Sequence, residues 1–241
     1  MIKPNIVSKE ILEQIYLAKT LVEKDPRFDL IRKQRIYHGF RAEANKHSVE
    51  IELPNGHKVK RGRARKIALD NLVLAEQFLS NHFGGEFTNE QLIVAATLIN
   101  GAKDKLAYRD ITARANNGEE YFIYPDNVPE EMLNFFAESK MLPNPVEKAI
   151  HAHFQVARIH PFEDCNGRLA RLLQNVVLDK NNLPPVMIEP FERKDYIDLI
   201  SRAARSYREN GNLIKPALSQ FYNYLALKIR DSLVKVRKRL D

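Results

Sequence analysis

Apolar residues recur every three or four positions in six segments of the chain, and this spacing predicts amphipathic α-helices. The segments are Ile11–Val22, Ala68–Leu79, Gln91–Leu98, Pro145–Ile159, Arg168–Leu178 and Leu218–Val236. Thr88 stands three residues before Gln91, which is the spacing of a capping box at the start of a helix. The expected fold class is therefore mainly α.

Two short segments interrupt the helical pattern, because their apolar residues alternate instead. Ser48–Lys60 alternates around Asn55-Gly56, and Ile111–Pro125 alternates around Asn117-Gly118. Such turn pairs between alternating residues are typical of β-hairpins, so both segments are predicted to be hairpins. Gly84-Gly85 suggests a boundary between an N-terminal region, residues 1–85, and a helical core, residues 86–241.

The composition places the chain among globular proteins. Its 241 residues are 44% hydrophobic and 29% charged. No apolar run approaches the roughly 20 residues of a membrane helix, and residues 1–14 lack the apolar centre of a signal peptide. A single cysteine, Cys165, forms no internal disulfide and fits a reducing compartment. We therefore expect a cytoplasmic protein.

The chain is basic, with a formal net charge of +7. Positive residues gather in Lys58–Lys66 and Lys235–Asp241. Most charge runs are solvated faces. The alternative is a helical nucleic-acid-binding module, whose affinity would depend on salt and would survive replacement of His160 or Arg171.

The segment His160–Arg171, HPFEDCNGRLAR, joins two predicted helices. Pro161 lacks a backbone donor and disfavours helical geometry at His160, so the first helix should stop there. The second helix should begin near Gly167. A helix N-terminus offers free N–H groups and a positive dipole end, which together bind phosphate.

The side chains of this loop suit phosphoryl chemistry. The backbone at Asn166 and Gly167 can approach an anion closely, and Arg168 and Arg171 can hold phosphate oxygens in pairs of hydrogen bonds. Asp164 is a carboxylate of the kind that binds Mg²⁺ together with substrate phosphates. His160 can accept a proton at neutral pH.

Each residue also has a simpler interpretation. His160 alone could end a helix, Asp164 could cap the next one, and Arg168 and Arg171 could lie on a solvated face. Phe162 is expected in the core. A metallohydrolase site built from His151, His153, His160 and Asp164 is disfavoured, because His151 and His153 are two positions apart on a helix and point to nearly opposite sides. A possible base, a carboxylate, a helix N-terminus and two arginines all occur within the twelve residues His160–Arg171, and this combination favours the phosphate site.

The loop resembles the signature H-x-F-x-[D/E]-G-N-G-R-x-x-R of the Fic (filamentation induced by cAMP) family. Seven of the eight specified positions match, namely His160, Phe162, Asp164, Asn166, Gly167, Arg168 and Arg171. The resemblance extends over roughly residues 90–207. It implies a Fic-type helical core in which the predicted Ile111–Pro125 hairpin is the flap that holds a target.

Cys165 departs from the family, which usually has glycine there. A glycine required for a positive φ angle would leave cysteine strained by about 1–2 kcal/mol. A glycine that only keeps a side chain away from the nucleotide could be replaced by a small cysteine turned aside. The intact flanking positions favour the second explanation, and Cys165 is counted among the nucleotide-binding residues.

Many Fic proteins also carry a helix with [S/T]-x-x-x-E-[G/N], whose glutamate pairs with the second arginine of the loop. Gly39–Asn45 is similar, with Glu43 at the glutamate position, Gly39 for Ser or Thr and Ala44 for Gly or Asn. This match predicts an inhibitory pair between Glu43 and Arg171. The simpler alternative is a surface glutamate. Arg205–Asn210 is a poorer match, one position out of register.

The resemblance implies a protein adenylyltransferase that uses ATP and Mg²⁺. His160 would be the base, Asp164 the metal ligand, and a Ser, Thr or Tyr of a target protein, or of the chain itself, the acceptor. Removal of AMP, or transfer of another phosphate-containing group, at the same site is the alternative chemistry.

Overall fold

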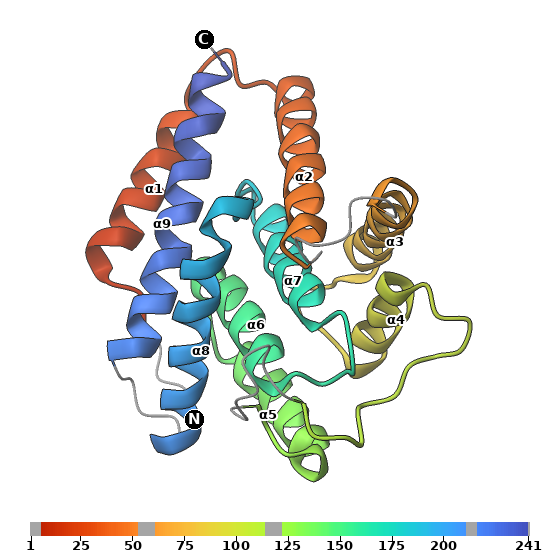
Figure 1. Ribbon diagram of the computed structural model, residues 1–241. Coiled ribbons are helices and arrows are strands. Elements are labelled where there is room, and N and C mark those ends of the chain that lie inside the picture. The colour runs from red at the N-terminus through yellow and green to blue at the C-terminus, as the bar shows by residue number, and fades with distance from the viewer. Residues whose placement is uncertain (1–5, 53–60, 114–121, 211–215, 241) are drawn as a thin grey trace.

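The computed structural model describes residues 6–52, 61–113, 122–210 and 216–240. Within these ranges the chain forms nine α-helices, two 3-10 helices and no β-strand (Figure 1). The helices are α1 (Lys9–Glu23), α2 (Leu30–Glu52), α3 (Arg61–His82), α4 (Asn89–Asn100), α5 (Val128–Lys140), α6 (Pro145–Ile159), α7 (Asn166–Lys180), α8 (Arg193–Asn210) and α9 (Pro216–Lys238). The 3-10 helices are η1 (Pro125–Asn127) and η2 (Pro190–Glu192).

All six helices predicted from the apolar spacing are present, as α1, α3, α4, α6, α7 and α9. The capping box at the start of α4 is confirmed, since the Thr88 hydroxyl accepts a bond from the Gln91 N–H and the Gln91 side chain accepts one from the Thr88 N–H. Helices α2, α5 and α8 are additional to that prediction.

The predicted hairpin at Ser48–Lys60 is wrong over its first five residues, because Ser48–Glu52 is the last part of α2. The buried residues of α2 include Tyr37, Phe40, Ala44, Ser48 and Ile51, and these positions recur at helical spacing. Residues 53–60 lie outside the described part of the chain. The predicted flap hairpin has its centre, residues 114–121, outside it as well, and its described flanks contain no strand.

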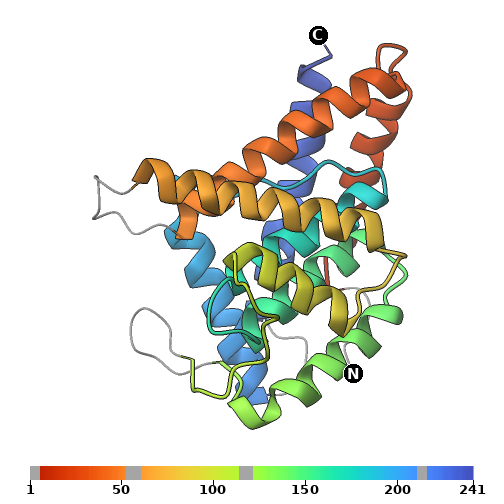
Figure 2. The ribbon, with the colours of Figure 1, turned by 90° about the vertical axis from the view of Figure 1, so that its right-hand side faces the viewer.

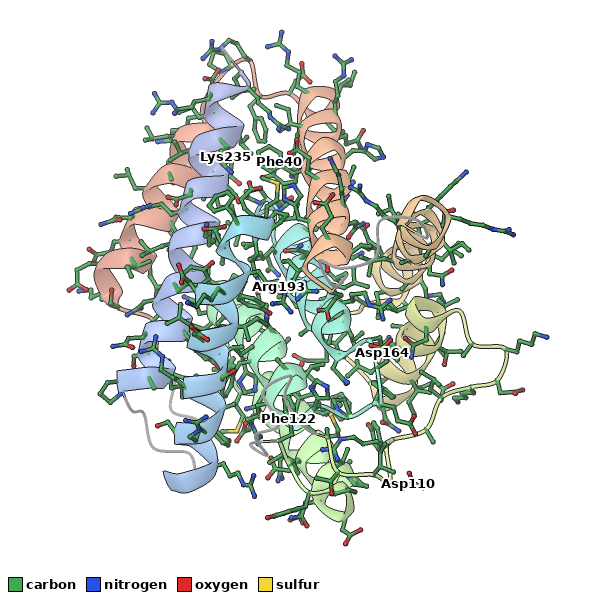
Figure 3. All side chains as sticks on the ribbon, viewed as in Figure 1. Phe40, Asp110, Phe122, Asp164, Arg193 and Lys235 are labelled. Atoms are coloured by element: carbon green, nitrogen blue, oxygen red, sulfur yellow. The ribbon has the colours of Figure 1, made fainter. Side chains whose placement is uncertain are left out.

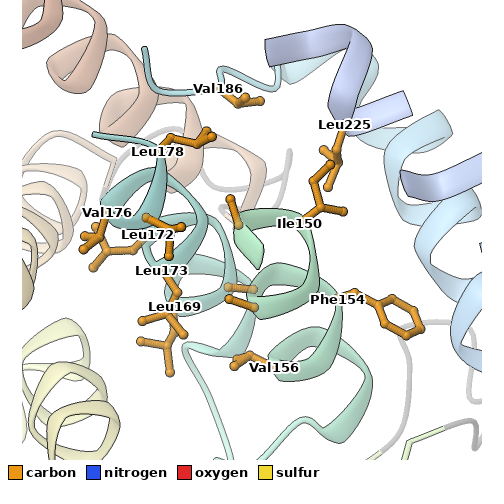
Figure 4. Packing of buried hydrophobic residues seen from close by; sticks show 14 of the residues in the cluster. Ile150, Phe154, Val156, Leu169, Leu172, Leu173, Val176, Leu178, Val186 and Leu225 are labelled. Atoms are coloured by element: carbon orange, nitrogen blue, oxygen red, sulfur yellow. The ribbon is translucent and has the colours of Figure 1, made fainter. Parts of the chain in front are cut away.

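Helices α6 and α7 form the centre of the fold, and the short loop 160–165 joins them. The apolar residues of α7 form a buried stripe: Leu169, Leu172, Leu173, Val176 and Val177. It packs with residues of α6 such as Ile150 and Val156 (Figure 4). The loop between the two helices is therefore anchored by buried apolar residues on both sides.

The other helices surround this pair (Figures 1 and 2). Helix α1 lies along α9, α3 along α4, and α2 packs on α3 and α7. One buried cluster includes Ile15 and Leu72 as well as Ile150 and Leu225, so residues on both sides of the predicted boundary at residue 85 share a core. None of the helices in the described ranges has the length and apolarity needed to cross a membrane.

Two buried histidines lie on opposite sides of α6, as their spacing predicts. His151 contacts the Tyr222 hydroxyl at 3.3 Å, and His153 contacts Gln174 Oε1 at 2.5 Å and the Tyr196 hydroxyl at 2.7 Å. Burial lowers the pKa of each to about 3. No group of three or more His, Cys, Asp or Glu suited to a metal occurs among the described residues.

These two histidines should make the fold sensitive to acid. Between their folded pKa of about 3 and the unfolded value of about 6.5, the unfolded chain binds protons that the folded chain does not. Their contribution to stability is thus complete above pH 6.5 or so and declines as the pH falls. Thermal unfolding from pH 7.5 to 4.5 should show a falling midpoint, with a shallower fall for His151→Gln. Equal slopes for the two proteins would contradict this origin.

Candidate active site

The end of α6 is set by the backbone of His160. This residue adopts φ 54° and ψ 57°, in the left-handed region, and its N–H donates to Val156 O at 3.0 Å. Pro161 follows, so the helix cannot continue. The prediction that α6 stops at His160 is confirmed.

The turn that follows is closed by the side chain of Asn166. Its Oδ1 accepts from the Phe162 N–H at 3.0 Å, and its Nδ2 donates to Phe162 O at 2.6 Å. Phe162 is buried against Tyr108, with 5.7 Å between ring centroids, as expected for a core residue. The side chain of Asn166 therefore shapes the loop, while its backbone starts α7.

Cys165 has φ 74° and ψ −6°, so glycine would be favoured here for its positive φ. The preferred sequence-based explanation, that only side-chain space matters, is corrected by this geometry. The thiol does turn aside, lying buried 3.9 Å from Ala96 O on α4. Burial raises the pKa of the Cys165 thiol to about 12, so it is neutral and a poor nucleophile. Only the backbone of Cys165 can face a ligand.

His160 lies against Phe122, with 4.0 Å between ring centroids. Burial lowers the pKa of His160 to about 4, and the nearby Arg109 adds to this effect, whereas a backbone contact with Ala157 and the carboxylates of Glu52 and Asp164 oppose it. The ring is therefore neutral at neutral pH. It has the protonation state that a general base requires.

Asp164, labelled in Figure 3, lies just before α7. It forms an ion pair of 3.0 Å with Arg168 in the first turn of that helix. The Asp164 side chain is 75% exposed, and its Oδ1 accepts from the Cys165 N–H at 2.6 Å. Arg168 also donates to Ile99 O at 3.3 Å, at the C-terminal end of α4. An exposed single carboxylate fits Mg²⁺ that is held mainly by substrate phosphates and water.

Arg171 is buried and points to α2. Its Nε donates to Ser48 Oγ at 2.8 Å, and its Nη2 donates to Ser48 O at 3.0 Å and to Glu52 Oε1 at 2.7 Å. It is also hydrogen-bonded to Tyr196 on α8. Arg168 points to α4 instead, so the two arginines predicted to act together have separate partners.

Glu43 does not pair with Arg171, which corrects the sequence-based hypothesis. Its carboxylate is 47% exposed and contacts Arg239 at 3.0 Å. The residue that does pair with Arg171 lies two and a half turns further along α2, at Glu52.

The Glu52 carboxylate occupies the region in front of the first turn of α7. A Cβ placed on Gly167 would overlap Glu52 Oε1, so the missing side chain is what makes room for the carboxylate. A negative group is favoured at this position by the N-terminal dipole of α7 and by Arg171. The site thus holds an anion supplied by the chain itself.

Comparison with known proteins agrees with this geometry. Residues 69–178 match the Fic/DOC family. The chain thus contains a segment that matches the Fic/DOC domain family.

Curated proteins similar to part of the chain are named protein adenylyltransferase Fic. The protein from Culex quinquefasciatus is 43% identical over 67 residues, covering 28% of this chain and 13% of the relative. The protein from Aedes aegypti is 30% identical over 120 residues, covering 50% of this chain and 20% of the relative. The chain thus matches only a fifth or less of the length of these two relatives.

Solved Fic structures share the fold over nearly the whole chain. A Fic domain containing signaling protein from Bacteroides thetaiotaomicron has a TM-score of 0.74 at 22% identity, covering 95% of this chain and 97% of its own. Fic-1 from Caenorhabditis elegans has a TM-score of 0.72 at 18% identity, covering 96% and 72%. IbpAFic2 in complex with adenylylated Cdc42 has a TM-score of 0.54 at 14% identity, covering 92% and 75%.

The sequence does contain a signal for Glu52. Ser48 and Glu52 occupy the Ser/Thr and Glu positions of the inhibitory motif described for many Fic proteins, and only Leu53 departs from its final Gly or Asn. Gly39–Asn45 matches that motif at the glutamate alone. The alternating residues that predict a hairpin at Ser48–Lys60 conceal this better match.

The conformation of Cys165 generates a prediction for the stability of the protein. Glycine at this position should relieve about 1–2 kcal/mol of left-handed strain, part of which is offset by the greater freedom of glycine in the unfolded chain. Alanine relieves none of it and loses the same buried sulfur. Cys165→Gly should therefore be more stable than Cys165→Ala by about 1 kcal/mol in denaturant unfolding. If the alanine variant is equally or more stable, positive-φ strain is not significant here.

Proposed function

We propose that this chain is a protein adenylyltransferase that transfers AMP from ATP to a Ser, Thr or Tyr hydroxyl of a target protein. The observation that carries the proposal is the neutral His160 beside an α7 N-terminus that already accommodates the Glu52 carboxylate. A helix end that accommodates a carboxylate is also suited to a phosphate. The names of the curated relatives and the adenylylated Cdc42 bound to IbpAFic2 support this choice of chemistry.

In the proposed reaction, His160 accepts the proton of the target hydroxyl as the oxygen attacks the α-phosphorus. A new phosphorus–oxygen bond forms, the bond to the β-phosphate oxygen breaks, and pyrophosphate leaves. Backbone N–H groups at Asn166 and Gly167 hold the phosphate oxygens, and Arg168 and Arg171 hold the outer phosphates. Asp164 would hold Mg²⁺, which neutralises charge on the phosphates when bound.

In this mechanism both arginines exchange partners when ATP binds. Arg168 leaves Asp164, which becomes available to the metal, and Arg171 leaves Glu52. The Glu52–Arg171 ion pair would inhibit the reaction, because Glu52 binds the guanidinium group that an outer phosphate requires. ATP bound while this ion pair is intact would be held in an unproductive position.

Removal of the Glu52 charge should accelerate self-modification with ATP labelled at the α-phosphate. A hydrogen bond to a charged group contributes about 1.5–3 kcal/mol, so Glu52→Gln should raise the rate roughly 10- to 100-fold. Glu43→Gln is the matched control on the same helix and should label at the parent rate. His160→Ala in the Glu52→Gln background should abolish the label. A rate for Glu52→Gln equal to that of the parent protein would contradict an inhibitory role for Glu52.

The position of the label on ATP distinguishes the alternative reactions. Transfer of AMP retains label from the α-phosphate and loses label from the γ-phosphate, and transfer of a phosphate does the reverse. Incubation of the Glu52→Gln protein with each labelled nucleoside triphosphate and Mg²⁺ should give label from α-labelled ATP only. Release of AMP from a premodified protein, dependent on both Glu52 and His160, would favour de-AMPylation instead. Absence of any His160-dependent label would contradict the proposed transferase function.

A further inference from the structure

Arg109 lies between α4 and η1 and is one of the most buried charged residues, with 3% of its surface exposed. Its guanidinium donates to Ile111 O at 2.7 Å, to His160 O at 2.6 Å, to Ile159 O at 3.3 Å and to Ile123 O. Its own N–H donates to Pro161 O at 2.9 Å. The Arg109 side chain thus connects the C-terminal end of α6 to the segments that contain Ile111 and Ile123.

The arrangement suits an arginine because the planar guanidinium has five donors in a fixed fork. Two of its acceptors, the carbonyls of Ile159 and His160, lie at the C-terminal end of α6, where the helix dipole is negative and the carbonyls have no partner within the helix. These carbonyls offset part of the cost of burying a cation. The other two acceptors belong to the segments that flank residues 114–121 on either side.

The positions of these four acceptors connect Arg109 to the proposed chemistry. Ile111 and Ile123 stand on the two sides of the predicted flap, which would hold the target hydroxyl. The His160 carbonyl belongs to the residue that would accept the proton of that hydroxyl. Phe122, next to Ile123, packs on the His160 ring, so the same group fixes both the peptide and the surroundings of the base.

We propose that Arg109 is a positioning residue that sets the distance between both sides of the flap and His160. It touches neither ATP nor the target in this scheme, and it acts by holding the left-handed His160 peptide in register with the described segments at Ile111 and Ile123. This inference rests on the proposed transferase function and adds to it the residue that aligns acceptor and base.

The charge of Arg109 has a second, separable effect. The charged groups that influence His160 are Arg109 from the loop after α4, Glu52 from α2 and Asp164 from its own loop. Arg109 lowers the pKa of His160, and the two carboxylates raise it. Lysine in place of Arg109 would keep the positive charge but lose the planar set of five donors. Glutamine would lose both the charge and this set of donors.

The test measures self-modification by α-labelled ATP in the Glu52→Gln background, with Arg109→Lys or Arg109→Gln added. Rates are divided by the number of ATP-binding sites from equilibrium dialysis, so that unfolded protein is not counted. Arg109→Gln should lower the rate per site about 100-fold, with KM for ATP nearly unchanged, because misplacement of the base affects the chemical step. Arg109→Lys should also lower the rate per site.

The pH dependence separates charge from geometry. The acidic limb of the rate profile should move to higher pH in Arg109→Gln, because loss of the cation raises the pKa of His160, and should stay in place in Arg109→Lys. Arg158→Lys is the matched control, since Arg158 is also buried but contacts Glu131, Gln155 and the Tyr207 ring. It should reduce thermal stability and leave the rate per site and the pH profile unchanged.

The outcomes distinguish this inference from the proposed function. If the Glu52→Gln parent gives no His160-dependent label, the transferase proposal fails and the Arg109 role fails with it. If the parent is active and both Arg109 variants keep its rate per site and its acidic limb, Arg109 is only a structural residue. A rise in KM for ATP without loss of rate at saturation would likewise overturn the positioning role.

Discussion

The buried guanidinium of Arg171 is the interaction on which the arrangement of the site depends. It joins α7 to Ser48 and Glu52 of α2 and to Tyr196 of α8. Tyr196 contacts His153, whose other nitrogen contacts Gln174 of α7, so the network returns to the helix on which it starts. A buried cation without these acceptors would be costly, and for this reason α2 and α8 must pack where they do.

The same interaction explains how a structural contact can control chemistry. The C-terminal end of α2 is negative, because its last carbonyls are unpaired within the helix and it carries Glu50 and Glu52. Three arginines hold it: Arg171, Arg193 (labelled in Figure 3), and Arg65. Arg193 donates to Ile51 O at 2.8 Å, and Arg65 pairs with Glu50. A triphosphate offers Arg171 the same kind of acceptor with more charge. In the proposed mechanism, binding of the triphosphate and docking of α2 therefore compete for the Arg171 guanidinium.

The sequence predicted the parts of the fold that local rules determine. Helix α6 could be bounded at both ends because Asn144 and Pro145 start it and Pro161 prevents its continuation, and α4 carries a capping box. The end of α2 could not be assigned in this way, because Val49 and Ile51 alternate as in a strand while Ser48 and Ile51 also continue the helical stripe of Phe40 and Ala44. Packing on α7 decides between the two patterns. The positive φ at Cys165 and the bonds of Arg109 also depend on distant partners.

The loop 160–165 begins and ends with a non-glycine residue in the left-handed region, His160 at φ 54° and Cys165 at φ 74°. Each such residue costs of order 1–3 kcal/mol and persists only where the surroundings leave no alternative. Here Asn166 closes the turn on Phe162, Arg109 holds the carbonyl of His160, and α6 and α7 are buried on either side. The two strained residues therefore belong to a turn that the core keeps rigid. That rigidity fixes the imidazole relative to the α7 N-terminus, as the proposed role of His160 as a proton acceptor beside a phosphate site requires.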